Sequence, residues 1–241
     1  MEPRISVIKN RLENIDEIIS VASGKGGVGK SLVASSLALN LSKKGKKVGL
    51  LDLDLYGPSS HIILGLSKFD FPEEENGIIP PKIDGINFMS IVIFTKDLPS
   101  AFRGIDITNI VIEILAITQW GKLDYLIIDM PPGIGDETLD VINLVKKSKF
   151  LVVTTPSKVA MGAVSKLLTM LKEQKLPTIG VVENMKMKKG DYIKNSVQEI
   201  NMEYLGSIDF DENLEESIGK PKELHETSFM KDMDKIVEKI L

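Results

Sequence analysis

The stretch "GKGGVGKS", residues 24–31, decides the fold, because it fits the phosphate-binding pattern G-x-x-x-x-G-K-[ST]. The apolar run "IISVAS" (18–23) precedes it and has the composition of a buried strand. The segment "SLVASSLALNLSKKG" (31–45) follows it with helical periodicity, and Gly45 suits the helix C-cap. A strand, a glycine-rich loop and a helix in this order predict that backbone N–H groups and the helix N-terminus bind phosphate.

The loop contains two lysines, although one is enough for a phosphate-binding loop. We expect Lys30 to reach the β- and γ-phosphates of ATP, and the Ser31 hydroxyl to ligate Mg²⁺. The spacing permits a role for Lys25 without assigning one. The residues expected to contact the nucleotide are Gly24, Lys25, Gly26, Gly27, Val28, Gly29, Lys30, Ser31 and Leu32.

The rest of the chain alternates short apolar runs with longer segments of helical period. Apolar strands separated by helices predict a mostly parallel sheet covered by helices on both faces, the three-layer α/β fold of P-loop NTPases. We expect further strands at 47–54, 86–94, 123–130, 150–156, 177–184 and 203–208, and helices at 106–119 and 227–241.

We interpret residues 1–241 as a single P-loop ATPase domain. Residues 1–17 would form an N-terminal extension, and 69–85 an irregular excursion for which a hairpin is one interpretation. The last helix carries charges of both signs opposite its apolar face, which favours packing in the core over lying on a membrane. Its apolar residues are Phe229, Met230, Met233, Ile236, Val237, Ile240 and Leu241.

Two further motifs place carboxylates at the ends of predicted strands, where parallel sheets bind ligands. In "DLDLYGP" (52–58), Asp52 and Asp54 could not both be buried cheaply without a cation or hydrogen-bond donors. One of them is therefore a candidate for orienting water or a metal-bound water, and a simple strand-ending turn is the alternative. In "LIIDMPPG" (126–133), Asp129 fits a Walker B carboxylate that holds Mg²⁺ through water.

Two other residues are weaker candidates for contacts with the nucleotide. Gly133 could donate its backbone N–H to the γ-phosphate and so respond to hydrolysis. Asn184 lies in "VVENM" (181–185), where its amide can both donate and accept, as an adenine edge requires. Asparagine is also common in turns, so this residue alone is weak evidence.

The composition and charge of the chain argue against several classes of function. The formal net charge of −4 gives no overall basic field that would favour nucleic acid. No apolar run is long enough to span a membrane, and the N-terminus lacks an apolar signal core, so we expect a cytoplasmic protein. The chain has no cysteine, which excludes disulfides, a thiol nucleophile and thiolate metal sites within it.

Six motifs together carry a family resemblance that spans roughly residues 18–221. The chain resembles the deviant Walker A branch of P-loop ATPases, which includes MinD, ParA and ArsA. Within it, the chain is most similar to the Mrp group, the ATP-binding iron–sulfur cluster carriers. The motifs are "SGKGGVGKS" (23–31), "DLDLYGPS" (52–59), "DYLIIDMPPGIGDETL" (124–139), "TTPSKVAMGAV" (154–164), "GVVENM" (180–185) and "LGSIDFDENLEESIGKP" (205–221).

The resemblance implies roles for the matching residues. Lys30 and Ser31 would bind phosphate and Mg²⁺, and Asp129 would be the Walker B acid. Asp54 would position the attacking water, while Asp52 would support the magnesium site. Members form dimers that enclose ATP between subunits, and Lys25 would reach across the two-fold interface to the nucleotide of the other subunit.

One departure from the family concerns its cargo. Mrp carriers have a C-x-x-C pair shortly after "ENM", whereas this chain reads "ENMKMKKGDYIKNSVQE" (183–199). Iron–sulfur clusters are held by thiolates, so a cluster held by this chain is doubtful. The first hypothesis is therefore a slow, Mg²⁺-dependent, homodimeric ATPase of iron–sulfur assembly that docks with a cysteine-bearing client. The alternatives are an ATP-driven dimer switch of MinD or ParA type, and a nucleotide-binding module with negligible turnover.

Overall fold

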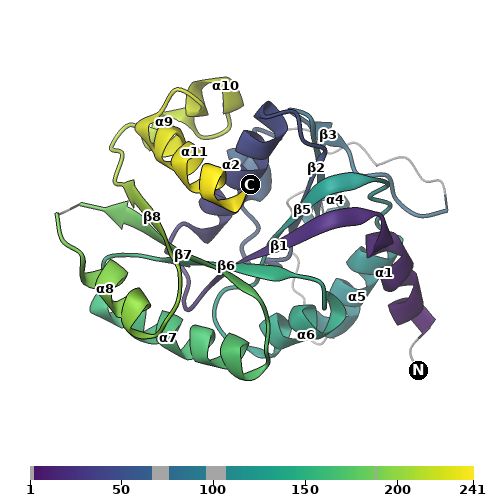
Figure 1. The fold of residues 1–241 in the computed structure, drawn as a ribbon. Coiled ribbons are helices and arrows are strands. Elements are labelled where there is room, and N and C mark those ends of the chain that lie inside the picture. The colour runs from purple at the N-terminus through teal and green to yellow at the C-terminus, as the bar shows by residue number, and fades with distance from the viewer. Residues whose placement is uncertain (1–2, 67–75, 96–106, 188) are drawn as a thin grey trace.

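The computed structural model describes residues 3–66, 76–95, 107–187 and 189–241 (Figure 1). They form an eight-stranded sheet in the order β3-β4-β2-β5-β1-β6-β7-β8, in which only β3 runs antiparallel to its neighbour. The strands are β1 Ile15–Ser23, β2 Val48–Asp52, β3 Lys82–Ile83, β4 Ile86–Ser90, β5 Leu123–Asp129, β6 Lys149–Thr154, β7 Thr178–Lys186 and β8 Tyr204–Asp209.

Helices cover both faces of the sheet, which confirms the predicted three-layer α/β fold (Figure 1). One face carries α2, α9, α10 and α11, and the other carries α1, α5, α6, α7 and α8. The helices are α1 Pro3–Glu13, α2 Lys30–Lys43, α3 Ser60–Ile63, α4 Val92–Thr95, α5 Ile107–Ile117, α6 Asp136–Leu144, α7 Lys158–Glu173, α8 Tyr192–Glu199, α9 Leu214–Ser217, α10 Pro221–Leu224 and α11 Ser228–Ile240.

The two helical layers explain why the central strands read as continuous apolar runs. All five residues of β2 are buried, and Leu126, Ile127 and Ile128 of β5 are fully buried. A strand covered on both faces has no solvent side, so neither set of alternating positions needs to be polar. Burying these side chains supplies much of the hydrophobic stabilisation of the fold.

Several predicted boundaries are corrected. The strand predicted at 86–94 ends at Ser90, whose Oγ accepts a hydrogen bond from Val92 N at 3.4 Å, and α4 follows. The strand β1 begins at Ile15, which pairs with Leu123, so it takes up the end of the supposed 1–17 extension. Most of the rest of that extension is α1, which packs on α5. The strand β7 continues beyond 184 to Lys186.

The excursion predicted at 69–85 is described only from residue 76 onwards. Its end is a hairpin, because β3 pairs antiparallel with β4 in the register Lys82↔Asn87 and Ile83↔Ile86. The two connecting residues, Asp84 and Gly85, have φ of 46° and 81°. Two residues with positive φ form the tight turn that suits the twist of a hairpin.

The C-terminal helix packs into the core, as its charge pattern predicted. Phe229, Met230, Met233, Ile236 and Val237 are buried, and the Thr227 hydroxyl caps the helix by accepting from Met230 N at 3.2 Å. Leu241 differs from the prediction, since it follows the helix and is 54% exposed. In the described parts of the chain, no helix has both the length and the apolar character needed to cross a membrane.

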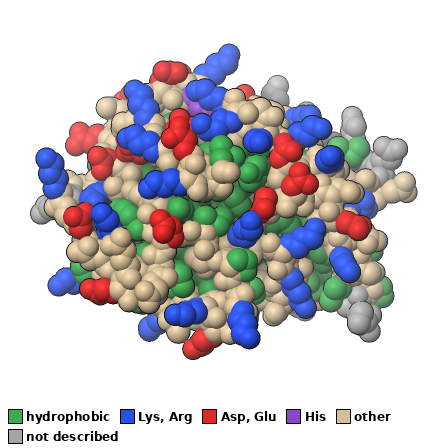
Figure 2. Space-filling model, viewed as in Figure 1, with side chains coloured by type: hydrophobic (Ala, Val, Ile, Leu, Met, Phe, Trp, Pro, Cys, Tyr) green, Lys and Arg blue, Asp and Glu red, His purple; other side chains and the backbone are tan. Residues whose placement is uncertain are grey.

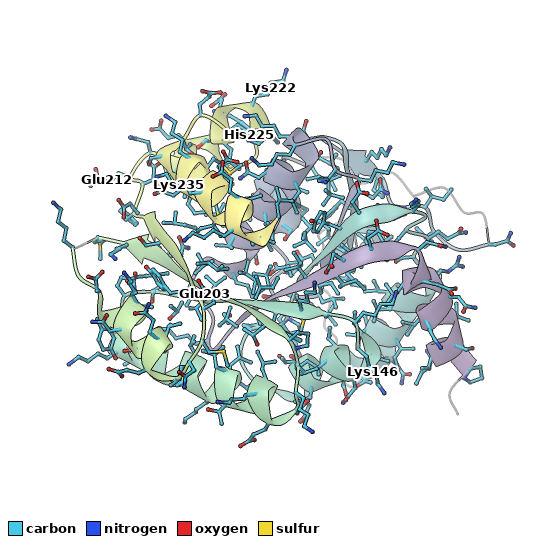
Figure 3. All side chains as sticks on the ribbon, in the orientation of Figure 1. Lys146, Glu203, Glu212, Lys222, His225 and Lys235 are labelled. Carbon is cyan, nitrogen blue, oxygen red and sulfur yellow. The ribbon has the colours of Figure 1, made fainter. Side chains whose placement is uncertain are left out.

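The strand β8 lies at the edge of the sheet, and α11 packs against it (Figure 3). Two side chains of α11 bond to the backbone of this strand. Lys239 Nζ donates to the Leu205 carbonyl oxygen at 2.6 Å, and Asp232 Oδ2 accepts from Asp209 N at 3.3 Å. Backbone groups of an edge strand are otherwise open to pairing with another chain, so these contacts close part of the edge.

Candidate functional site

The predicted phosphate loop lies between the end of β1 and the start of α2. Gly27 and Gly29 have φ of 76° and 78°, a conformation that favours glycine, and the Gly29 carbonyl accepts the first helical bond from Val33 N at 3.0 Å. The loop borders a cavity of ≈ 330 Å³. The cavity is lined by Ser23, Lys25, Gly26, Gly27, Gly29, Lys30, Ser31, Leu32, Asp54, Gly57, Ser59, Ile63 and Pro132.

Two glycines of this loop should respond differently to substitution. A Cβ at Gly24 would lie 2.5 Å from the Ala163 carbonyl carbon in α7, whereas a Cβ at Gly26 would meet no atom within 4 Å. We expect Gly24→Ala to lower the Tm by about 5 °C through overpacking, and Gly26→Ala to leave it nearly unchanged. Thermal unfolding of the nucleotide-free variants measures this, and equal Tm values would contradict the close contact between the loop and α7.

A buried ion pair involves Lys30, which lines the cavity. Lys30 Nζ is 2.5 Å from Asp129 Oδ1, and their side chains are 6% and 0% exposed. Burial raises the pKa of Asp129, while Lys30 and the Ser31 hydroxyl act to lower it. The structure therefore brings together the predicted P-loop lysine, the magnesium-binding serine and the Walker B acid.

A second carboxylate lies beside this pair. Asp52 ends β2, pairs in register with Asp129 on β5, and is fully buried. Its Oδ1 accepts from Asp54 N at 3.0 Å, and its Oδ2 from Ser60 N at 3.2 Å. Burial, together with the charge of Asp129, raises the pKa of Asp52 to about 7. Asp52 is thus a buried carboxylate with two backbone donors. This agrees with the expectation that a carboxylate buried at this position needs hydrogen-bond donors or a cation.

These residues have the chemistry of a Mg²⁺ site. Two neighbouring buried carboxylates face one lysine ammonium, so the cluster can accept further positive charge. Mg²⁺ usually takes one or two carboxylates, with water and substrate phosphates completing its shell. Asp52, Asp129 and Ser31 fit that pattern. Within the described residues, no group of three or more His, Cys, Asp or Glu side chains is placed to hold a metal.

Asp54 lies on the cavity wall, in the loop between β2 and α3. Its Oδ1 accepts from Gly57 N at 3.1 Å, and its side chain is half-buried. This bond restrains the carboxylate of a residue that lines the cavity. The position suits the water-orienting role expected for Asp54, which stays a prediction.

Lys25 is half-buried at the opening of the cavity. Its carbonyl oxygen accepts a hydrogen bond from Ser23 Oγ at 3.0 Å, which fixes the backbone. Within the described part of the chain its ammonium forms no ion pair.

Gly133 makes a contact that differs from the one expected. Its N–H donates to the Ser23 carbonyl at 3.1 Å, and its φ is 86°. A bond from this N–H to a γ-phosphate would need the link to β1 to break. The glycine does lie beside the loop, since Ser23 immediately precedes it, but the phosphate contact stays a prediction.

Asn184 also has a structural task. Its side chain is 2% exposed, and Nδ2 donates to the Val28 carbonyl at 3.0 Å. The adjacent Met185 has φ of 58°, and its side chain lies close to Gly29. The end of β7 thus supports the phosphate loop, a contact that the sequence did not indicate. Reading of the adenine edge by Asn184 stays a prediction.

Two more polar residues near the strand ends were missed by the sequence reading. Ser60 is fully buried and bonds to both Asp52 and Asp129. Glu183 is 2% exposed, and its Oε2 accepts from Tyr204 Oη at 2.7 Å and Lys186 Nζ at 3.2 Å. Burial and the Glu183 carboxylate raise the pKa of Tyr204. Glu183 lies within the motif "GVVENM" but was not singled out there, and Ser60 lies one residue beyond "DLDLYGPS".

A strand–loop–helix phosphate cradle with Lys30, Ser31 and two strand-end carboxylates defines the nucleotide site of a P-loop protein. Residues 14–241 match the family model described as ParA, NUBPL iron-transfer P-loop NTPase, and the chain belongs to this family. The family resemblance inferred from the motifs is thereby confirmed.

Relatives named iron–sulfur cluster carrier protein are similar to much of the chain. The protein of Aquifex aeolicus is 38% identical over 227 residues, covering 88% of this chain and 62% of the relative. The protein of Pyrococcus horikoshii is 34% identical over 270 residues, covering 99% and 92%. The chain thus spans about three fifths of the length of the Aquifex relative. It covers the same share, 62%, of a relative from Pseudomonas fragi.

Solved structures share the fold. A nucleotide-binding protein of Archaeoglobus fulgidus in complex with ADP has a TM-score of 0.77 and 32% identity, covering 92% of this chain and 93% of that one. The cell division ATPase MinD of Pyrococcus furiosus has a TM-score of 0.70 and 24% identity, covering 93% and 98%. The second likeness shows the fold alone.

Proposed function

We propose that this chain is a slow, Mg²⁺-dependent ATPase that works as a homodimer in iron–sulfur cluster assembly. The proposal is carried by Lys30 and Ser31 in the lining of a glycine-rich cavity, with Lys30 paired to Asp129 and Asp52 in register beside it. Membership of an iron-transfer P-loop family, with relatives named iron–sulfur cluster carriers, supports the cellular role.

The residues of the site suggest how hydrolysis proceeds. Backbone N–H groups of the loop hold the phosphates, and Lys30 exchanges its buried carboxylate partner for phosphate oxygens. Asp54, fixed by Gly57, orients the attacking water on the cavity wall. Ser31, with Asp52 and Asp129, would hold Mg²⁺, which would supply positive charge beside the phosphates.

The absence of cysteine shapes the proposed partner. A cluster needs thiolates, and this chain has none to offer. We infer that the ATPase acts on a cysteine-bearing iron–sulfur protein in the cytoplasm, which holds the cluster itself. Figure 2 shows blue and red side chains mixed over the visible face, without a large field of one sign. That surface favours a protein client over nucleic acid.

The positioning switch of MinD or ParA type is less well supported. The apolar face of α11 is packed in the core, so this helix has no apolar face available to a membrane. We therefore propose no second function.

One experiment tests the proposed function as a whole. The protein is purified without oxygen, and phosphate release from ATP is measured with and without Mg²⁺. In parallel, transfer of a cluster from a loaded scaffold to a cysteine-bearing apo-protein is followed with and without ATP. Mg²⁺-dependent release and ATP-dependent acceleration of transfer are expected. Release without any effect on transfer would refute the assembly role, and absence of release would refute the ATPase.

The dimer is tested by Lys25→Ala. If Lys25 contacts the nucleotide of the other subunit, the variant should bind ATP as a monomer and hydrolyse it about 100-fold more slowly. Sedimentation velocity with ATP and phosphate release measure these effects. Lys46→Ala removes an exposed lysine after α2, outside the cavity, and should behave as wild type. An unchanged rate per subunit in Lys25→Ala would rule out the role across the interface.

A further inference from the structure

Ser60 is the first residue of α3 and connects the two buried carboxylates of the site. Its N–H donates to Asp52 Oδ2 at 3.2 Å, and its hydroxyl donates to Asp129 Oδ2 at 3.4 Å. The residue is fully buried, so neither bond competes with solvent. The backbone and the side chain of one residue thus join the ends of β2 and β5.

Nucleotide binding would change the bonding of some partners of Asp129 and not of others. Asp129 Oδ1 faces Lys30 at 2.5 Å, and the Ser31 hydroxyl acts to lower the pKa of the carboxyl group. In the proposed function, Lys30 turns to the phosphates and Ser31 to Mg²⁺. Ser60 has no such second task, so its bond to Oδ2 is the one that can persist and hold the plane of the carboxylate.

Ser60 also fixes the loop that carries Asp54. The bond from Ser60 N to Asp52 closes this loop at its base, and the hydroxyl bond ties the closed loop to β5. Asp54 lies between these points and is further fixed by its bond to Gly57 N. The distance between the water-orienting carboxylate and the Walker B carboxylate therefore depends on the Ser60 hydroxyl.

We propose that Ser60 is a positioning residue that aligns Asp129 for the metal and holds the Asp54 loop against β5. The proposal rests on the proposed function, because it assumes that Asp129 serves a divalent cation. Residues that orient metal ligands from behind typically contribute about 10- to 100-fold to metal affinity or activity. Ser60 is in the position to act this way on Asp129.

Direct binding of Mn²⁺ in the presence of ADP, followed by electron paramagnetic resonance, tests the proposal without relying on turnover. We expect Ser60→Ala to bind Mn²⁺ about tenfold more weakly, while its affinity for ADP without metal stays within about twofold of wild type. Ser60→Thr keeps the hydroxyl and should bind Mn²⁺ more tightly than Ser60→Ala. Ser148→Ala deletes another buried hydroxyl, which bonds to Ser20 Oγ at 2.6 Å away from the site, and should bind Mn²⁺ as wild type.

The possible results distinguish a failure of the role proposed for Ser60 from a failure of the proposed function. Wild-type Mn²⁺ affinity in Ser60→Ala would overturn the positioning role. Equal loss of ADP binding with and without metal would also overturn it, because Ser60 would then only maintain the loop. If the wild-type protein itself fails to bind Mn²⁺ with ADP, the proposed Mg²⁺-dependent function fails, and the role of Ser60 falls with it.

Discussion

Asp54→Asn is expected to slow ATP hydrolysis by about 100-fold or more while ATP affinity stays within about twofold. Asparagine keeps the oxygen that accepts from Gly57 N, so the loop retains its bond. It loses the negative charge and the basicity that would orient a water and take up its proton. Steady-state phosphate release and calorimetric titration of ATP measure the two quantities separately.

A matched control is available at the other end of the sheet. Asp124 Oδ2 accepts from Lys47 N at 2.7 Å, which resembles the bond of Asp54 to a backbone donor. Asp124→Asn should leave both rate and affinity unchanged, because the residue is the second of β5 and lies outside the cavity. Hydrolysis at the wild-type rate in Asp54→Asn would assign the water to another residue.

Lys30→Met is expected to weaken ATP binding by about 100-fold and to destabilise the free protein. The first effect follows from the loss of charged hydrogen bonds to the phosphates. The second follows because Asp129 is fully buried and would lose its ion-pair partner. Breaking a buried pair on one side costs about 3 kcal/mol. The double variant that combines Lys30→Met with Asp129→Asn should regain most of the stability but none of the ATP binding.

The stability loss in Lys30→Met should depend on pH. Burial already raises the pKa of Asp129, and removing the lysine raises it further. The folded state then binds a proton more tightly than the unfolded state does. The unfolding free energy of the variant therefore falls, relative to wild type, as pH rises from the unfolded-state pKa through the folded-state pKa. Urea unfolding should show a larger deficit at pH 8 than at pH 5, and a constant deficit would contradict the unpaired charge.

The sequence predicted the parts of the site that depend on local order along the chain. Lys30 belongs to a pattern that follows an apolar strand, and Asp129 ends another apolar strand. The parallel topology then brings the two residues together. The ends of the strands were harder to predict. The run from Ile91 to Phe94 is as apolar as a strand, and a run this short cannot be distinguished from a buried helical turn by its periodicity.

The contacts that were missed all join segments far apart in the chain. Asn184 supports the loop through Val28, and Gly133 bonds to Ser23, although each was expected to bind the nucleotide. Asparagine and glycine at a strand end suit either use, because the same donor can meet a phosphate, a base or a carbonyl. In this structure both donors bond to the protein's own backbone, and their contacts with the nucleotide stay predictions.

The contacts of α11 with the edge strand limit how partners can join the protein. Because Lys239 and Asp232 occupy backbone groups of β8, a client cannot extend the sheet there by adding a strand without displacing both side chains. Pairing of edge strands between copies of the chain, which leads to fibres in sheet proteins, is hindered at the same strand. At the β8 edge, the proposed client and a second copy of the chain are therefore recognised through side chains rather than through an added strand.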